Sequence, residues 1–411
     1  MPAGRWSGDL QVTNVLLHVL VTLAAIIVLG RALGRLLKPL GQPQVIADIL
    51  AGILLGPSLI GAHAAATLLP QGAAPALGLI AQIGVILYMF IVGLETNAGT
   101  LRGEWRRTAA IASAGMVAPF ALGVLLATVL YPRFADPRVP PSDFELFMGV
   151  ALSVTAFPVL ARILADRNLQ RTPIGSMALA CAAAGDVAAW CVLALVVGMV
   201  DAQGHGTTVV LRTLGFAAAM LVVVRPLVQR WSLRVTPNEA GNGAIASALV
   251  GCLFSAAITE WIGIHALFGA FLFGLLIPHD CALAQALERR LHDVVSVVFL
   301  PAFFAYSGLR TQIGLVDGVA QWLAVAAIVA VATVGKFGGV AASARAIGFG
   351  WRDSAILGSL MNARGLVELI VLNIGLDVGV LSPQVYSMLV LMALATTIAT
   401  APMLRLFGAK A

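Results

Sequence analysis

The sequence predicts an all-α polytopic membrane protein with about 13 transmembrane helices, and three features of its composition support this class. Of 411 residues only 11% are charged, 60% are hydrophobic, and the mean hydropathy is +0.97. A soluble domain carries about 25% charged residues, so the surface of this chain cannot face water throughout. Disorder is also excluded, because disordered chains are rich in charge and poor in apolar residues.

The individual spans follow from runs of about 20 apolar residues, the length that crosses a bilayer core. Pro and Gly recur inside these runs, and membrane helices tolerate them where neighbours satisfy the freed backbone groups. The runs lie near residues 10–30, 44–61, 75–97, 108–131, 143–164, 172–200, 207–229, 241–260, 262–278, 291–309, 318–344, 353–376 and 382–404.

Lys and Arg residues orient these spans. One set of alternate loops holds 17 of them, and the opposite set holds five: Arg5, Arg133, Arg138, Arg212 and Arg310. Because cytoplasmic loops retain positive residues, we expect the N-terminus outside and the C-terminus in the cytoplasm, in a cell membrane such as a bacterial inner membrane. This bias accounts for the net charge of +6 without a nucleic-acid partner. All loops are short, so we expect one membrane domain and no soluble regulatory domain.

Few ionisable residues remain near the middle of a span: Asp186, Lys336 and the pair Arg364–Glu368. A charge at the bilayer centre costs roughly 2.5–3.5 kcal/mol, so such residues are functional by default. A structural ion pair is the alternative in each case. Lys336 is either a counter-charge to an acid or an anchor to a backbone carbonyl. Arg364 and Glu368 are spaced i,i+4 on one helical face, which favours a structural pair.

Asp186 is the strongest candidate for a functional charge. It lies in the stretch CAAAGDVAAW, where small neighbours allow water and an ion to approach. A carboxylate can hold a proton, and it is also a hard-oxygen ligand for a metal ion such as Na⁺ or K⁺. One group that holds either species in turn is what exchange chemistry requires.

Two spans contain helix-breaking residues. Pro158 interrupts the stretch ALSVTAFPVLARIL by removing a backbone donor, and Asn362 and Gly365 weaken LMNARGLVEL. Paired interrupted helices in corresponding positions of two halves indicate the midplane site of a transporter. An odd number of spans separates the two halves, which predicts an inverted repeat. We found no nucleophile–base pair, metal-ligand spacing or nucleotide motif, so we expect neither an enzyme nor a cofactor.

Several longer stretches resemble a known family, the second monovalent cation/proton antiporter family of the sodium/hydrogen exchanger superfamily. It includes Kef-type potassium efflux systems and plant cation/proton exchangers. The similar stretches cover almost the whole chain in family order: QPQVIADILAGILLGPSLIG (42–61), LYMFIVGLE (87–95), SVTAFPVLARIL (153–164), GDVAAW (185–190), IGIHALFGAFLFGLLIP (262–278), LPAFFAYSGLRT (300–311), GK (335–336) and LMNARGLVELIVLNIG (360–375).

The resemblance implies an inverted-repeat antiporter fold with two broken crossing helices. It implies a core of approximately 108–200 and 318–404 and a dimerisation scaffold of approximately 10–97 and 207–309. The core would move like an elevator within a homodimer.

The resemblance also assigns residues to the ion site. Asp186 matches the ion-binding aspartate, Thr155 and Ser153 lie by the crossing, and Lys336 matches the core lysine. One departure is Gly185, where many relatives carry a second acid or an Asn; a single acid favours electroneutral one-for-one exchange.

The leading hypothesis is therefore secondary active exchange of Na⁺ or K⁺ for protons, with a role in pH homeostasis. Two alternatives stay open at this point. One is a Kef-like cation efflux channel, and the other is a proton- or sodium-coupled symporter of an organic anion on a similar fold.

Overall fold

The computed structural model describes residues 6–57, 70, 73–95, 105–167, 169, 172–200, 206–236 and 241–408. Within these ranges every regular element is a helix. Nine of the helices in the described ranges are long and apolar enough to cross a membrane, and α2 and α12 are shorter apolar helices. Two predicted spans, 143–164 and 353–376, are each divided into a pair of helices. The prediction of an all-α membrane protein with two broken helices is confirmed.

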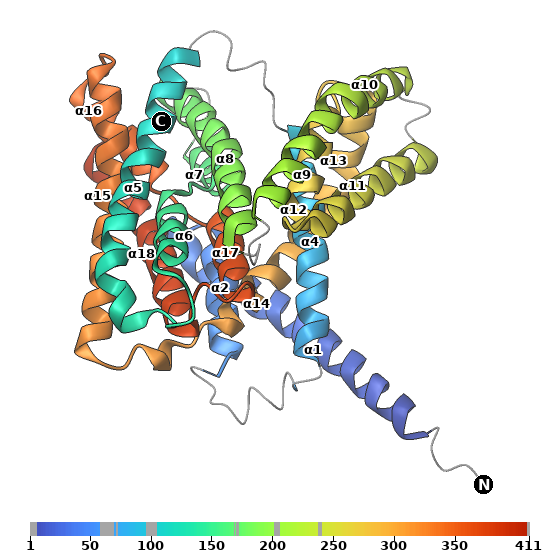
Figure 1. Cartoon of the computed structure of the whole chain (residues 1–411), viewed down its shortest axis with the longest axis horizontal. Coiled ribbons are helices and arrows are strands. Elements are labelled where there is room, and N and C mark those ends of the chain that lie inside the picture. Colours follow the sequence, from blue (N-terminus) through green and yellow to red (C-terminus); the bar gives the residue numbers. More distant parts are fainter. Residues whose placement is uncertain are drawn as a thin grey trace.

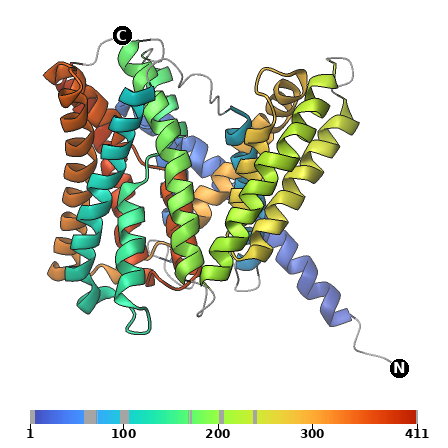
Figure 2. The same ribbon diagram turned by 45° about the horizontal axis from the view of Figure 1, so that its top comes forward.

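The helices form two groups that lie side by side (Figures 1 and 2). We call the first group the crossing bundle, because it contains both broken helices. It consists of α5 (Trp105–Phe134), α6 (Pro141–Ser153), α7 (Phe157–Asp166), α8 (Pro173–Val200), α15 (Val319–Ala346), α16 (Trp351–Met361), α17 (Leu366–Asp377) and α18 (Pro383–Leu406).

We call the second group the flanking bundle. It consists of α1 (Trp6–Leu37), α2 (Gln44–Leu55), α4 (Ala74–Glu95), α9 (Gly206–Ala219), α10 (Arg225–Arg234), α11 (Asn242–Ile262), α12 (Ala266–Leu276), α13 (Ala282–Val294) and α14 (Leu300–Arg310). Short π-helical turns, Met220–Val224 and Val295–Phe299, join α9 to α10 and α13 to α14. Predicted span 44–61 is helical to Leu55, and its last residues lie outside the described ones.

Glycines allow two helix pairs of the flanking bundle to approach each other closely. A Cβ atom at Gly52 of α2 would collide with the carbonyl oxygen of Ala305 in α14, and one at Gly308 would collide with that of Ile49. The α4–α12 pair repeats this arrangement, since a Cβ atom at Gly93 or Gly274 would meet the backbone of the partner helix. Small residues at such crossings let membrane helices pack backbone against backbone.

The outer surfaces of both bundles are apolar. Large hydrophobic side chains remain more than half exposed along them, for example Leu125 on α5, Val222 between α9 and α10, and Phe254 on α11. In lipid such side chains need no protein partner, because the hydrocarbon tails are as apolar as the side chains themselves. The exposed apolar surface therefore agrees with a protein embedded in a bilayer.

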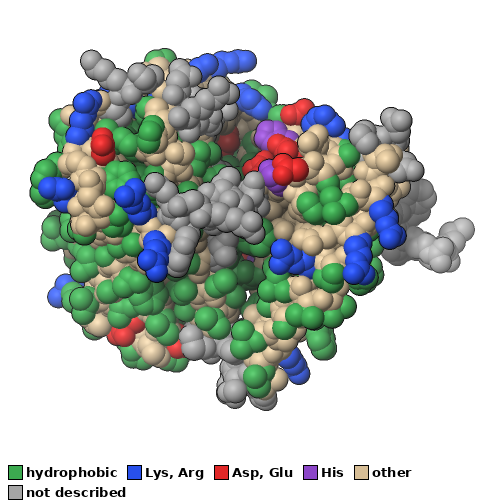
Figure 3. Space-filling model, turned by 90° about the horizontal axis from the view of Figure 1, so that it is seen from above, with side chains coloured by type: hydrophobic (Ala, Val, Ile, Leu, Met, Phe, Trp, Pro, Cys, Tyr) green, Lys and Arg blue, Asp and Glu red, His purple; other side chains and the backbone are tan. Residues whose placement is uncertain are grey.

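One end of the bundles carries many basic side chains. The end of α18, the start of α16 and helix α10 lie at the top of Figure 1, and α1 begins at the bottom. Lys and Arg side chains are spread over the top face, which is seen from above in Figure 3. We call this the cationic face, and the other end the opposite face.

Candidate functional site

The two broken helices meet at their breaks, in the middle of the crossing bundle. In the first, residues 154–156 are extended between α6 and α7. In the second, Asn362 ends α16 and Gly365 precedes α17. One backbone hydrogen bond joins the breaks, from Ala156 N to Ala363 O (3.4 Å).

The first break lies before Pro158, not at it. Helix α7 begins at Phe157, so Pro158 occupies its first turn. A proline is well tolerated there, because the N–H groups of a first helical turn have no intrahelical acceptor. Proline therefore marks the start of the second half-helix, while the carbonyl groups that lose their helical partners belong to the end of α6.

Two cationic side chains satisfy these carbonyl groups. Lys336 of α15 donates from Nζ to the carbonyl oxygen of Ser153. Arg364 donates to the carbonyl oxygens of Ala151 (2.9 Å) and Leu152 (2.5 Å). The C-terminal end of a helix carries partial negative charge, so cations from the other half of the bundle are well placed there.

Arg364 also forms an ion pair with Glu368, with 2.7 Å between Nη1 and Oε2, and both side chains are completely buried. Thr397 of α18 holds the backbone of the same arginine: its hydroxyl accepts from Arg364 N (3.0 Å) and lies 2.8 Å from Arg364 O. The predicted pair is thus present, and further hydrogen bonds of Arg364 to Thr397 and to the end of α6 hold it in place.

Asp186 has a different environment. Its carboxylate is buried, and Oδ2 accepts one hydrogen bond, from the backbone N–H of Phe157 (3.3 Å). That donor is the first N–H of α7, where the helix dipole favours a negative charge. Oδ1 is buried and has no partner, and Lys336 and Asp186 form no ion pair. A Cβ atom at the neighbouring Gly185 would meet open space.

The hydroxyl groups of Ser153 and Thr155 differ in whether they have a hydrogen-bond partner. Ser153 Oγ donates back to the carbonyl oxygen of Val150 (2.8 Å), within its own helix. Thr155 Oγ1 is buried without a partner, as are both side-chain amide atoms of Asn362. A buried polar atom without a hydrogen bond is costly, so these atoms mark the crossing as a place where a polar or charged ligand could be bound.

A cavity leads from the cationic face toward Asp186. It measures about 540 Å³ and lies between α7 and the flanking bundle. The flanking side contributes polar groups, including Asp48, Tyr88, Glu95 and His292, and the crossing side contributes Phe157, Val159 and Ala161. Acidic and histidine side chains gather at one place on this face in Figure 3. Phe157 lines the cavity and its backbone N–H donates to Asp186, so one residue connects the cavity with the carboxylate.

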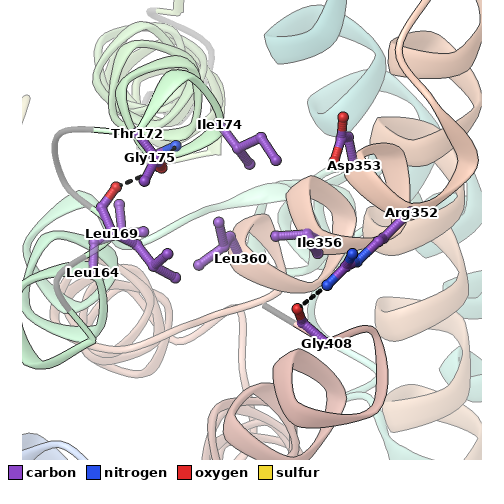
Figure 4. Close-up of a pocket in the computed structure, with 10 residues that line it drawn as sticks. All are labelled: Leu164, Leu169, Thr172, Ile174, Gly175, Arg352, Asp353, Ile356, Leu360 and Gly408. Atoms are coloured by element: carbon purple, nitrogen blue, oxygen red, sulfur yellow. Dashed lines mark hydrogen bonds between the residues drawn. The ribbon is translucent and has the colours of Figure 1, made fainter. Parts of the chain in front are cut away.

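A second pocket is separate from this route (Figure 4). It measures about 240 Å³ and is lined only by the crossing bundle and the segments next to its helices, with Leu164, Ile356 and Leu360 among its apolar residues. At its rim Arg352 donates to the carbonyl oxygens of Phe407 (3.1 Å) and Gly408. Neither Asp186 nor its partner Phe157 lines this pocket, so it lies apart from the cavity described above.

Sequence reasoning gave the polar groups of the flanking bundle no role in the site. Asp48 lies in an apolar run, yet it is buried and accepts a hydrogen bond from Gln44 (2.8 Å). Arg310 was counted only for orientation, although it contacts Asn373 and Asp377 of the crossing bundle. Hydropathy identifies charges in the middle of a span, whereas the contacts of Arg310 join spans far apart in the sequence.

Interrupted helices that cross beside buried charged residues define a secondary transporter of the inverted-repeat class. The profile of one family, described as "Sodium/hydrogen exchanger, transmembrane", matches residues 21–406. This chain therefore belongs to the sodium/hydrogen exchanger family, which is a family of transporters. The resemblance read from the sequence is confirmed.

The names of individual relatives are in accordance with this family. The chain is 40% identical to the Na(+)/H(+) antiporter NhaS4 of Synechocystis sp., over 95% of this chain and 97% of that protein. It is 41% identical to Cation/H(+) antiporter 20 of Arabidopsis thaliana and 33% identical to K(+)/H(+) antiporter 1 of Saccharomyces cerevisiae. These matches cover 97% and 89% of this chain, but only 49% and 43% of the plant and yeast proteins.

One solved structure has a similar fold. It is the sodium proton antiporter MjNhaP1 from Methanocaldococcus jannaschii, with a TM-score of 0.69 and 13% sequence identity. The superposition covers 95% of this chain and 98% of that one. At this low identity the match speaks for the fold alone.

Proposed function

We propose that this protein is a secondary active antiporter that exchanges a monovalent cation, Na⁺ or K⁺, for protons. The observation that carries the proposal is the buried carboxylate of Asp186, which has one unpartnered oxygen and is hydrogen-bonded to Phe157, a residue that lines the wide cavity. The names of the relatives, which include Na⁺/H⁺ and K⁺/H⁺ antiporters, support the same activity.

In this proposal Asp186 binds the two ions alternately. A proton neutralises the carboxylate in one half of the cycle, and a cation replaces it in the other. The unpartnered hydroxyl of Thr155 supplies a second oxygen for the cation, whereas the hydroxyl of Ser153 is already engaged by Val150. Lys336 and the Arg364–Glu368 pair hold the ends of the broken helices in place. With one acid at the site, we propose a one-for-one, electroneutral exchange.

We further propose that the crossing bundle is the moving core and the flanking bundle the scaffold, within a homodimer. The wide cavity on one face supports alternating access, because the cavity beside Arg310 near the opposite face has a volume of only about 30 Å³. We place the cationic face in the cytoplasm of a cell that carries the protein in its plasma membrane, in accordance with the positive-inside rule. The structure then corresponds to an inward-open state.

The alternative activities receive less support. An organic anion needs an unpaired basic group, but Lys336 and Arg364 are both bound to carbonyl oxygens or to Glu368. A channel needs a path open to both faces at once. Here the cavity at the cationic face measures about 540 Å³, but the one near the opposite face measures only about 30 Å³.

The test uses the purified protein in liposomes with an internal pH dye, challenged in turn with Li⁺, Na⁺, K⁺ and Rb⁺. We expect cation-dependent proton flux that is abolished in Asp186→Asn, which keeps the shape of the side chain but cannot release a proton. Asp136→Asn is the matched control, because Asp136 is an acid of the same bundle in an exposed loop. Undiminished flux in Asp186→Asn would refute the assignment. A potassium/valinomycin clamp then shows whether net charge moves.

A further inference from the structure

A group of side chains at the opposite face connects the two bundles. Arg310, at the end of α14, donates from Nη2 to Asp377 (2.6 Å) and from Nη1 to Asn373 (3.0 Å). Both partners lie on α17, within the second broken helix of the crossing bundle. The guanidinium group therefore spans the boundary between the bundles.

A second layer of hydrogen bonds lies behind this contact. Asn373 Nδ2 donates to Ser307 Oγ of α14 (2.7 Å), and the hydroxyl of Tyr386 in α18 donates to Ser307 O (3.0 Å). Ser307, Asn373 and Tyr386 are all buried. We call these five residues, Ser307, Arg310, Asn373, Asp377 and Tyr386, the clasp.

The flanking bundle holds its part of the clasp in position. The guanidinium of Arg310 lies over the ring of Tyr306, with 5.6 Å from Cζ to the ring centroid. The hydroxyl end of Tyr306 in turn packs against Gly78 of α4, where a Cβ atom would come within 2.9 Å of it. Arg310 is thus fixed on the flanking side, while its acceptors belong to the crossing side.

The two ends of the boundary are unequal. The clasp residues Arg310, Asn373 and Asp377 line the 30 Å³ cavity, which narrows the opposite face. At the cationic face a side-chain hydrogen bond runs from Gln42 to Ile398 O of the crossing bundle (3.3 Å), and it is exposed. There the wide cavity separates the bundles. The polar contacts of the clasp therefore lie at the end of the boundary away from the wide cavity.

We propose that the clasp is a state-dependent lock that closes the opposite face and must open in every transport cycle. The proposal rests on the antiporter function, because it requires the crossing bundle to move against the flanking bundle. Displacement of α17 along α14 separates Arg310 from both acceptors, so the clasp exists in only one of the two end states. Arg310 is a positioning residue in this scheme and touches no transported ion.

The strength of the contact suits a lock that opens repeatedly. The side chains of Arg310 and Asp377 are 23% and 42% exposed, and partly exposed ion pairs contribute only modestly to stability. Loss of the charge on Asp377 should shift the equilibrium toward the state open at the opposite face by about fivefold.

Thiol labelling measures this shift. In a background without the four native cysteines, Ile374→Cys reports on the opposite face and Ala161→Cys on the cationic cavity, since each position lines the corresponding cavity. A charged maleimide should label position 374 about fivefold faster when Asp377→Asn is added, and position 161 more slowly. Arg310→Gln should have the same effect, and the double variant should add little to either single one.

Asp136→Asn serves as the matched control. It breaks an exposed ion pair with Arg138 (2.7 Å), but both of these residues belong to the crossing bundle. This variant should leave both labelling rates unchanged. Unchanged labelling of position 374 in Asp377→Asn and Arg310→Gln proteins that still transport would overturn the proposal.

A cross-link tests the same lock without relying on a weakened contact. With Arg310→Cys and Asp377→Cys bridged by a short bifunctional thiol reagent, flux should stop, and cleavage of the bridge should restore it. An equivalent bridge between Asp136→Cys and Arg138→Cys should not affect flux. Full flux in the bridged 310–377 protein would also overturn the lock. Absence of flux in the wild-type protein would instead contradict the antiporter function itself.

Discussion

The two halves of the crossing bundle share one helix pattern but treat their buried acids differently. In α5–α8, Asp186 accepts a single hydrogen bond from the backbone of Phe157 and keeps one oxygen unpartnered. In α15–α18, Glu368 also has one unpartnered oxygen, Oε1, but its Oε2 is paired with Arg364, which binds the carbonyl oxygens at the end of α6 as well. The second half thus supplies the charges that complete the first, while the first keeps a carboxylate available for a ligand. In the proposed function this repeated framework divides its tasks, with support in one half and ion exchange in the other.

The largest effect, a loss of stability caused by a change in the supporting half, should come from Arg364→Met. Removal of one partner from a buried ion pair leaves an uncompensated charge and costs about 3–5 kcal/mol, and the carbonyl oxygens of Ala151 and Leu152 lose their donor as well. We expect a much lower melting temperature in thermal unfolding of the detergent-solubilised protein. The double variant Arg364→Met/Glu368→Met should be less damaged, because it leaves no unpaired charge. Melting of Arg364→Met at the wild-type temperature would show that the pair does not support the fold.

An intermediate effect should come from Lys336→Met, which separates the two roles considered for this residue. As an anchor, Lys336 satisfies Ser153 O, and loss of a hydrogen bond from a charged donor costs about 1.5–3 kcal/mol of stability. We therefore expect a lower melting temperature with an unchanged pH profile of flux. Val334→Met is the control, since Val334 lies on the same helix and is exposed. A shifted pH profile without loss of stability would support the counter-charge role instead.

The smallest effect should be a change in the KM for the cation, and it should differ between the two hydroxyl groups of the first break. Thr155→Val removes an unpartnered hydroxyl, so stability should not fall, but the KM for the cation should rise about tenfold if one oxygen ligand is lost. Ser153→Ala removes a hydroxyl that is bound within its own helix and should leave the KM unchanged. Cation titrations of proton flux in liposomes measure both. Equal KM values in the two variants would mean that Thr155 is not a ligand.

Much of this architecture could be predicted from the sequence, because lipid imposes strict rules on a chain. The breaks around Pro158 and Gly365 were identified from residues that cannot continue a helix, and the buried charges were identified by their cost in hydrocarbon. The i,i+4 spacing of Arg364 and Glu368 predicted their pair, which the structure contains.

Other features depend on contacts that no local pattern encodes. The choice of the Ser153 carbonyl as the acceptor for Lys336 depends on the packing of α15 against α6, and the contact of Thr397 with Arg364 depends on α18. The partners of Arg310 lie more than sixty residues away in the chain. Such contacts follow from the arrangement of the two bundles, so they became visible only in three dimensions.

The glycine crossings of the flanking bundle also bear on how the protein is made. The short helix α2 packs through Gly52 against α14, and α4 packs through Gly93 against α12. Helices near the N-terminus therefore have partners that are synthesised much later. During synthesis α2 enters the membrane long before α14 exists. The whole first half of the crossing bundle is inserted in the interval. The ribosome must therefore pass residue 308 before the flanking bundle can close, and until then α2 relies on lipid and on α1 for its packing.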